Sequence, residues 1–175
     1  AQHGHTAVVG RLLEARANAN RTTANGLPPL HGAVVGGFVQ VVERLLKAKA
    51  NPDLAESNCP FCVWSAAAKG HVEVLTALLR SGAKAQVWSI KRGPPLVAAI
   101  SLGPAGEPCV AALLAAQASP EDCDGHSPLA FACTTADKPG ASAVVARLLA
   151  LKAAPGTAAP SQPLDVAAGR IVAAG

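Results

Sequence analysis

The sequence is poor in the residues that build bulky cores. It contains no methionine and no tyrosine, and aromatic residues supply only 3% of its 175 positions. Charged residues make up 15%, whereas alanine alone occurs 39 times. Sandwich and barrel cores are rich in β-branched and aromatic residues, so a large β core is not expected here. An alanine-rich chain whose larger apolar residues are leucine and valine favours closely packed helices.

The chain also lacks the segments that direct a protein to a membrane or out of the cell. A membrane-spanning helix needs about 20 apolar residues, and the most apolar stretch, residues 96–118, is interrupted by Pro104, Glu107 and Pro108. Residues 1–5 lack the basic-then-apolar order of a signal peptide. Five cysteines at irregular spacing do not form the even set of a secreted disulfide framework. We therefore expect an intracellular, cytoplasmic protein and, because no methionine opens the sequence, a fragment of a longer chain.

A repeat with a period of 33 residues runs through the first half of the sequence. Each copy opens on a glycine, and these are Gly4, Gly37 and Gly70. Pairs of valine or leucine follow at helical spacing, as at 41–42 and 45–46 in the second copy. A small residue then recurs at matched positions, which are Ala17, Ala50 and Ala83. Helices this short are not stable alone, so each is expected to bury its apolar stripe on a neighbouring repeat.

A second motif precedes the repeated helix. Upstream of Gly37 the sequence reads Pro28-Pro29-Leu30-His31-Gly32-Ala33, and weaker versions begin at Gly93, Gly125 and Gln162. With the 33-residue period, this pattern resembles the ankyrin repeat, whose units read Gly-x-Thr-Pro-Leu-His-x-Ala-Ala-x-x-Gly-His before Val-Val and Leu-Leu. The resemblance implies an all-α fold, an ankyrin-repeat solenoid of stacked helix-turn-helix units joined by β-hairpin loops. It implies one array over residues 1–175, with units at 1–22 (partial), 23–55, 56–88, 89–121, 122–155 and 156–175 (partial).

The sequence departs from the family pattern at the helix ends. The threonine that caps the first helix of a unit is replaced by Pro28, Phe61 and Pro94, and only Ser127 keeps a hydroxyl. Losing such a cap costs about 1 kcal/mol per helix. The glycine that usually follows the second helix survives only as Gly82; it is replaced by Arg16, Lys49 and Lys152. Extra residues at 103–108 and 134–142 lead us to expect regular packing in residues 1–90 and looser packing beyond.

The resemblance implies a non-enzymatic protein–protein interaction module that binds its partner through a concave face of hairpin tips and first helices. The candidate partner-binding residues are Ala24, Asn25, Leu27, Val35, Ser57, Asn58, Pro60, Ala68, Lys69, Ile90, Lys91, Ser101, Leu102, His126 and Thr134. This strip is small and weakly charged, and it lacks the Tyr, Trp and Arg anchors that dominate many interfaces. We expect a modest, extended interface. The identity of the partner, the oligomeric state and a role as a mere spacer between domains stay open.

Charge is unevenly distributed along the chain. Residues 1–92 hold 11 Lys or Arg and 5 Asp or Glu, whereas residues 93–175 hold 4 and 6. A basic first half favours an acidic protein partner. Nucleic acid is not expected, because the basic residues are scattered and no aromatic stacking residues accompany them.

The sequence carries no phosphate-binding loop and no H-E-x-x-H motif, so neither an enzyme nor a cofactor is expected. His5 and His71 follow the glycines that open the repeats. We interpret both as structural residues of the loop between the paired helices.

A different class of function, thiol-based redox chemistry or metal binding, depends on Cys59 and Cys62. Their Cys-x-x-Cys spacing places Cys62 at a helix start, where a thiol pKa can be lowered. Zinc takes four ligands, however, and the nearest further candidates, Cys123, His126 and Cys133, lie two repeats away. No metal site is assigned, and small buried or half-buried thiols are the competing interpretation.

Overall fold

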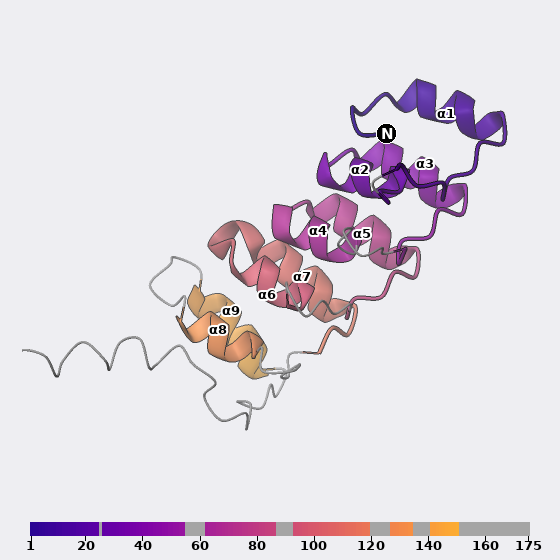
Figure 1. The fold of residues 1–175 in the computed structure, drawn as a ribbon. Coiled ribbons are helices and arrows are strands. Elements are labelled where there is room, and N and C mark those ends of the chain that lie inside the picture. The colour runs from indigo at the N-terminus through magenta and orange to yellow at the C-terminus, as the bar shows by residue number, and fades with distance from the viewer. Residues whose placement is uncertain (25, 55–61, 87–92, 120–126, 135–140, 151–175) are drawn as a thin grey trace, which may run out of the picture.

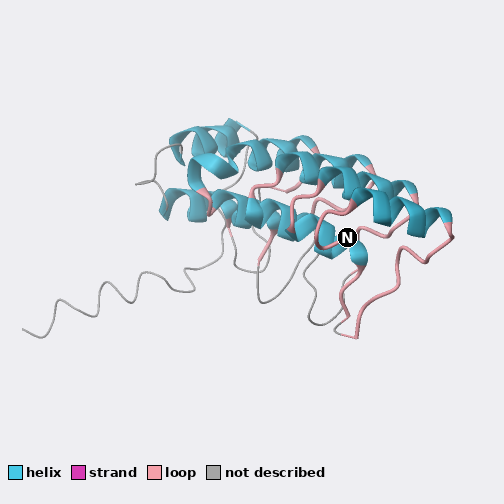
Figure 2. Cartoon of the chain, turned by 90° about the horizontal axis from the view of Figure 1, so that it is seen from above, coloured by secondary structure: helices cyan, strands magenta, loops and turns pink. Residues whose placement is uncertain are grey.

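The computed structural model describes residues 1–24, 26–54, 62–86, 93–119, 127–134 and 141–150. Within these ranges the chain is helical and forms no strand (Figure 2). The elements are α1 (Thr6–Glu14), α2 (Pro29–Val35), α3 (Val39–Lys47), α4 (Cys62–Lys69), α5 (Val72–Arg80), α6 (Pro95–Ile100), the 3-10 helix η1 (Gly103–Gly106), α7 (Glu107–Ala115), α8 (Pro128–Thr134) and α9 (Ala141–Ala150).

The helices form two layers of a stacked array (Figures 1 and 2). In one layer α2, α4, α6 and α8 pack in that order, and these are the first helices of their units. In the other layer α1, α3, α5 and α7 pack in that order, and these are second helices. Each first helix also packs on the second helix that follows it, as α2 does on α3. The expected all-α solenoid is confirmed.

Buried alanines keep the 33-residue period across the first-helix layer. Ala33, Ala66, Ala99 and Ala132 are all 0% exposed, one on each first helix. Larger apolar residues recur in the same register at Leu30, Val63, Leu96 and Leu129, and each is buried. Because protein interiors are close-packed, a methyl side chain at the alanine positions lets successive helices approach closely.

The second-helix layer keeps the same register until an insertion. Val41 and Val74 are buried 33 residues apart, and Cys109 occupies the equivalent place 35 residues further on. The extra residues lie before α7, where η1 forms. A Cβ atom on Gly106 would collide with the carbonyl oxygen of Ala99, so glycine is needed for this turn to lie against α6. The insertion expected at residues 103–108 is confirmed.

The helix ends follow the sequence predictions where they are described. Pro28 and Pro94 precede α2 and α6 without a side-chain cap. Ser127 does cap α8, because its Oγ accepts a hydrogen bond from the Ala130 N–H at 3.3 Å. Phe61 and Lys152 lie outside the described residues.

The second helices end in one shared turn. Arg16, Lys49 and Gln117 adopt left-handed φ values of 59°, 64° and 60°, and Gly82 adopts 89°. In each case the next amide donates to a carbonyl five residues back, as Ala50 does to Leu45 at 2.9 Å. This hydrogen bond is typical of the Schellman motif, whose left-handed position favours glycine.

Polar side chains join neighbouring loops. The Asn20 Oδ1 accepts from the Asn51 N–H at 2.7 Å, and its Nδ2 donates to the Lys49 carbonyl at 3.3 Å. One repeat later, Asp53 Oδ1 accepts from the Lys84 N–H at 3.1 Å. These hydrogen bonds join residues that lie 29–31 positions apart and hold successive units in register.

The two ends of the array differ from its middle. Val8 and Leu12 are 57% and 54% exposed, whereas their equivalents Val41 and Leu45 are 0% and 2% exposed. The expectation that every repeated stripe is buried is therefore wrong for α1, because no earlier helix of the described residues packs on it. At the other end α9 packs mainly on α8. The partial unit at 156–175 lies outside the described residues, and the unit boundaries stay predictions.

Candidate functional site

A row of accessible residues marks the ends of the first helices. Val35, Ala68, Ser101 and Thr134 lie 33 residues apart, at or next to the last residue of α2, α4, α6 and α8. Val35 is 41% exposed; Ser101 and Thr134 are exposed and Ala68 is half-buried. The structure thus brings four candidate residues, distant in sequence, into one periodic row, here called the first-helix row.

The first-helix row is chemically plain. The Ser101 hydroxyl donates to the Val97 carbonyl at 2.9 Å, and the Thr134 hydroxyl donates to Phe131 at 2.8 Å. Both protons are therefore used within their own helices. Beside the row lie Lys69, which is exposed, and Leu102, which is half-buried. Among the described candidate residues of the face, Lys69 is the one cation and the others are small or apolar, as expected from the sequence.

One hairpin-like loop of the candidate face is partly described. The Thr23 N–H donates to the Leu27 carbonyl at 3.0 Å, and the Leu27 N–H donates to the Thr23 Oγ1 at 3.2 Å. The Gly26 N–H closes the turn on the Thr23 carbonyl, and Gly26 has a φ of 72° that favours glycine. Ala24 is exposed at this turn and Leu27 is half-buried at its base. The other candidates, Asn25, Ser57, Asn58, Pro60, Ile90, Lys91 and His126, lie outside the described residues.

Histidines connect neighbouring units. His71 Nε2 lies 3.3 Å from the Val35 carbonyl oxygen, and its ring lies against Gly37 of the preceding unit. His71 therefore serves the loop between paired helices, which confirms its structural interpretation. His5 is exposed and makes no side-chain cap to α1. His31 is buried, with its Nε2 3.4 Å from the Ser65 Oγ, a pairing that the sequence analysis missed because it joins different units.

The described thiols do not form a reactive cluster. Cys62 and Cys109 are buried, and Cys133 is exposed. Burial raises the pKa of Cys109, and the nearby Glu73 carboxylate raises it further, which is the opposite of thiolate activation. Among the described residues no group of three or more His, Cys, Asp or Glu could hold a metal ion. Cys59 and Cys123 lie outside the described residues, so the hypothesis based on Cys59 and Cys62 stays a prediction.

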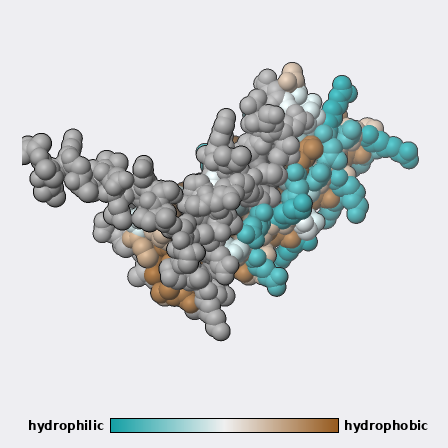
Figure 3. Space-filling view, turned by 60° about the horizontal axis from the view of Figure 1, so that its bottom comes forward, coloured by the Kyte–Doolittle hydropathy of each residue, from teal (hydrophilic) through white to brown (hydrophobic). Residues whose placement is uncertain are grey.

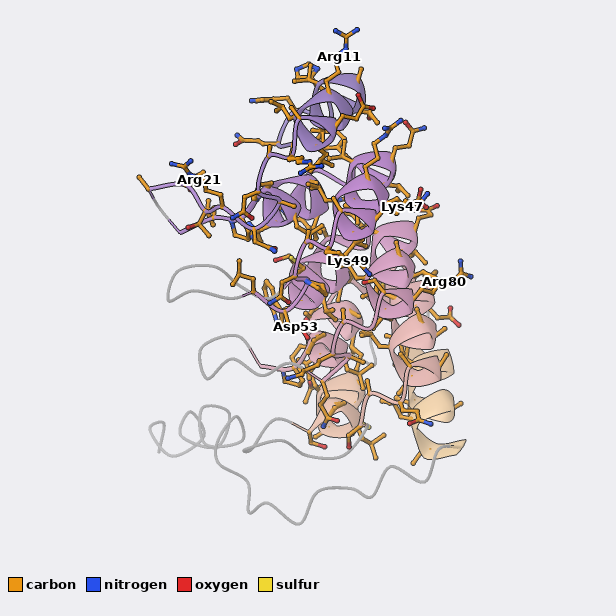
Figure 4. All side chains as sticks on the ribbon, turned by 90° about the vertical axis from the view of Figure 1, so that its right-hand side faces the viewer. Arg11, Arg21, Lys47, Lys49, Asp53 and Arg80 are labelled. Atoms are coloured by element: carbon orange, nitrogen blue, oxygen red, sulfur yellow. The ribbon has the colours of Figure 1, made fainter. Side chains whose placement is uncertain are left out.

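Basic side chains line the second-helix layer. Figure 4 shows Arg11, Lys47 and Arg80 projecting from that side of the array, with Arg21 and Asp53 on the loop side. Arg11, Arg44, Lys47 and Arg80 are all exposed. In Figure 3 hydrophilic residues form a band along one side of the array, with hydrophobic residues between them. No helix of the described part is both long and apolar enough for a membrane span.

Comparisons with known proteins agree with the periodic geometry. A family model described as ankyrin repeats, in three copies, matches residues 1–89, which is more than half of the chain. The chain belongs to the ankyrin repeat family. Ankyrin repeats act as protein–protein interaction modules, and nothing in these comparisons points to catalytic activity.

A solved ankyrin array is similar over most of the chain. It is the crystal structure of the human ASB11 ankyrin repeat domain, 26% identical, with a TM-score of 0.69. The match covers 87% of this chain and 67% of that one. The comparison with curated proteins gives no significant match.

Proposed function

We propose that this ankyrin array binds a partner protein through its concave face, with the first-helix row and the hairpin tips in contact. The observation that supports this proposal most strongly is the regular spacing of the row, which takes one accessible residue from each of four successive units. Matched positions on stacked units make an extended surface, which a partner can span over several repeats. The array itself catalyses no reaction and acts as a non-enzymatic scaffold inside the cell.

The composition of the face restricts the partner. Because the described row offers Val35, Ala68, Ser101 and Thr134 and no aromatic or arginine anchor, the larger anchoring side chains come from the partner. Lys69 and the basic first half of the array favour an acidic protein. Acidic residues on the partner then speed encounter more than they strengthen the final complex.

A labelling experiment with matched variants tests the proposed face. The array is fused to a proximity-labelling enzyme and compared with two variants, Val35→Arg/Ser101→Arg on the face and Ala7→Arg/Gln40→Arg on the second-helix layer. All four positions are exposed, so both variants are expected to fold and carry the same added charge. Proteins that wild type and the second-helix variant label, but the face variant does not, support the proposal. Equal labelling by all three arrays refutes it.

The thiol hypothesis is tested separately by Cys59→Ser/Cys62→Ser. Partner labelling survives this change if the array is a scaffold. A loss of labelling, or zinc bound by the purified wild-type chain and not by the variant, favours the thiol alternative.

A further inference from the structure

A groove lies on the second-helix layer, between α3 and α5. It has a volume of about 660 Å³ and is here called the outer-helix groove. Its floor consists of half-buried apolar side chains, which are Val39, Leu46, Val72 and Ala77. Its rims carry four exposed charged residues, Glu43 and Lys47 from α3 and Glu73 and Arg80 from α5. The sequence alone does not indicate this groove, because its lining comes from helices of two different units.

The hydroxyl groups of the outer-helix groove are already engaged. Thr76 Oγ1 donates to the Val72 carbonyl at 2.9 Å, and Ser81 Oγ donates to the Leu78 carbonyl at 2.6 Å. Both protons are used inside α5, so Thr76 adds a methyl group to the floor. The polar character of the groove therefore depends on the four rim charges.

The rim charges are ordered along the groove. Glu43 precedes Lys47 by about one helical turn, and Glu73 precedes Arg80 by about two turns. Equivalent helices of stacked repeats run in the same direction. The acidic residue lies mid-helix in α3 and at the start of α5, and a basic residue ends each helix, so both rims become basic toward the helix ends. An occupant that matches this field carries acidic groups near Lys47 and Arg80 and basic groups at its other end.

We propose that the outer-helix groove binds a short amphipathic helix of a partner protein, about three turns long and antiparallel to α3 and α5. A helix is stabilised by acidic residues in its first turn and basic residues in its last turn. Only the antiparallel orientation places such a helix with its acidic turn beside Lys47 and Arg80. In that orientation the positive N-terminal end of the bound helix also lies beside the negative C-terminal ends of α3 and α5, which is favourable. The nine-residue lengths of α3 and α5 correspond to about 14 Å, which limits the contact to about ten residues.

Two synthetic peptides test this proposal. Both are fluorescein-labelled, hydrocarbon-stapled helices of about 12 residues, with leucines at i, i+3, i+4 and i+7 in an alanine background. One has glutamates in its first turn and lysines in its last, and the other has these charges exchanged. Fluorescence anisotropy is expected to show about tenfold tighter binding of the first peptide, since four exposed charge pairs change sign. Equal affinity for the two peptides, or no binding of either, overturns the proposal.

Two charge-reversal variants locate the binding. Lys47→Glu/Arg80→Glu is expected to remove the preference for the first peptide. Arg11→Glu/Arg44→Glu changes the net charge equally, at exposed second-helix residues outside the groove lining, and is expected to retain it. An equal loss in both variants assigns the effect to overall charge and overturns the proposal. All four are surface changes, so folding is expected to survive, and circular dichroism checks this.

Sedimentation distinguishes a second copy of the chain from a partner helix. Self-association of wild type that Lys47→Glu/Arg80→Glu abolishes assigns the groove to a second copy and overturns the proposal. The outer-helix groove lies on the opposite layer from the proposed concave face. Peptide binding is therefore expected to persist in Val35→Arg/Ser101→Arg, so the two proposals fail independently.

Discussion

Replacing Lys49 by glycine is expected to stabilise the array. Lys49 lies in the turn that follows α3 and has a φ of 64°. The left-handed region costs an L-residue roughly 1–2 kcal/mol. Glycine removes that strain from the folded state. It also raises the conformational entropy of the unfolded chain, which lowers the free energy of unfolding by roughly 0.4–1 kcal/mol. The expected net gain is about 0.5–1 kcal/mol. For a domain of this size it corresponds to a rise in Tm of about 1–4 °C.

The reverse substitution at Gly82 isolates the backbone term. Gly82 occupies the same turn one repeat later, with a φ of 89°, and an added Cβ would meet no atom within 4 Å. The cost of Gly82→Ala is therefore conformational, and we expect a loss of about 0.5–1 kcal/mol.

Lys49→Ala is the matched control, because it removes the lysine side chain and keeps the strained backbone. Its effect is expected to stay within about 0.5 kcal/mol. Urea unfolding followed by circular dichroism measures all three variants. Backbone strain at this turn is contradicted if Lys49→Gly is no more stable than Lys49→Ala, or if Gly82→Ala leaves the unfolding midpoint unchanged.

Three further substitutions test the packing, a cap and a buried thiol. Leu45→Ala is expected to lower the free energy of unfolding, measured in urea, by about 2–5 kcal/mol. Leu12→Ala, at the exposed equivalent position, is expected to lower it by less than about 1 kcal/mol. Equal losses would contradict the packing of α1. Ser127→Ala is expected to lower the free energy of unfolding by about 1 kcal/mol and to speed amide exchange in α8. Unchanged exchange would show that Ser127 does not stabilise α8 as a cap. Burial and Glu73 raise the folded-state pKa of Cys109, so its contribution to stability is complete below the ordinary thiol pKa of about 8.5 and is lost as pH rises toward the folded pKa. Cys109→Val is therefore expected to flatten the alkaline loss of stability in unfolding curves taken between neutral pH and about pH 10, and an unchanged slope would contradict this origin.

Much of the fold could be predicted from the sequence because the array repeats its packing. Ala66 and Ala99 are buried on helices that each pack between two other first helices, so the same small residue recurs at a constant spacing. The cap at Ser127 and the insertion that contains η1 are local features, and local sequence predicted both.

Features that join different units could not be predicted in the same way. The contact of His31 with Ser65 and that of Asn20 with Asn51 depend on how two turns of the solenoid face each other. Val8 and the buried Val41 occupy equivalent positions of the repeat, so the sequence does not distinguish them. Val8 is exposed because, in the described part of the chain, no helix packs beyond α1.

The candidate site was predictable in position and less so in chemistry. The family resemblance placed Val35 and Thr134 on one face, and the structure aligns them in the first-helix row. It did not indicate that the Ser101 and Thr134 hydroxyl protons are used by their own helices. The outer-helix groove could not be predicted from the sequence, because it forms between α3 and α5, which belong to different units.

Hydrogen–deuterium exchange of the array, alone and with the partner identified by proximity labelling, shows whether the concave face binds. If the concave face binds, amides near Val35, Ala68, Ser101 and Thr134 exchange more slowly in the complex, and so do those of the loop at residues 23–27. Protection confined to the outer side of α3 and α5, with the ends of the first helices unchanged, would contradict binding at the concave face.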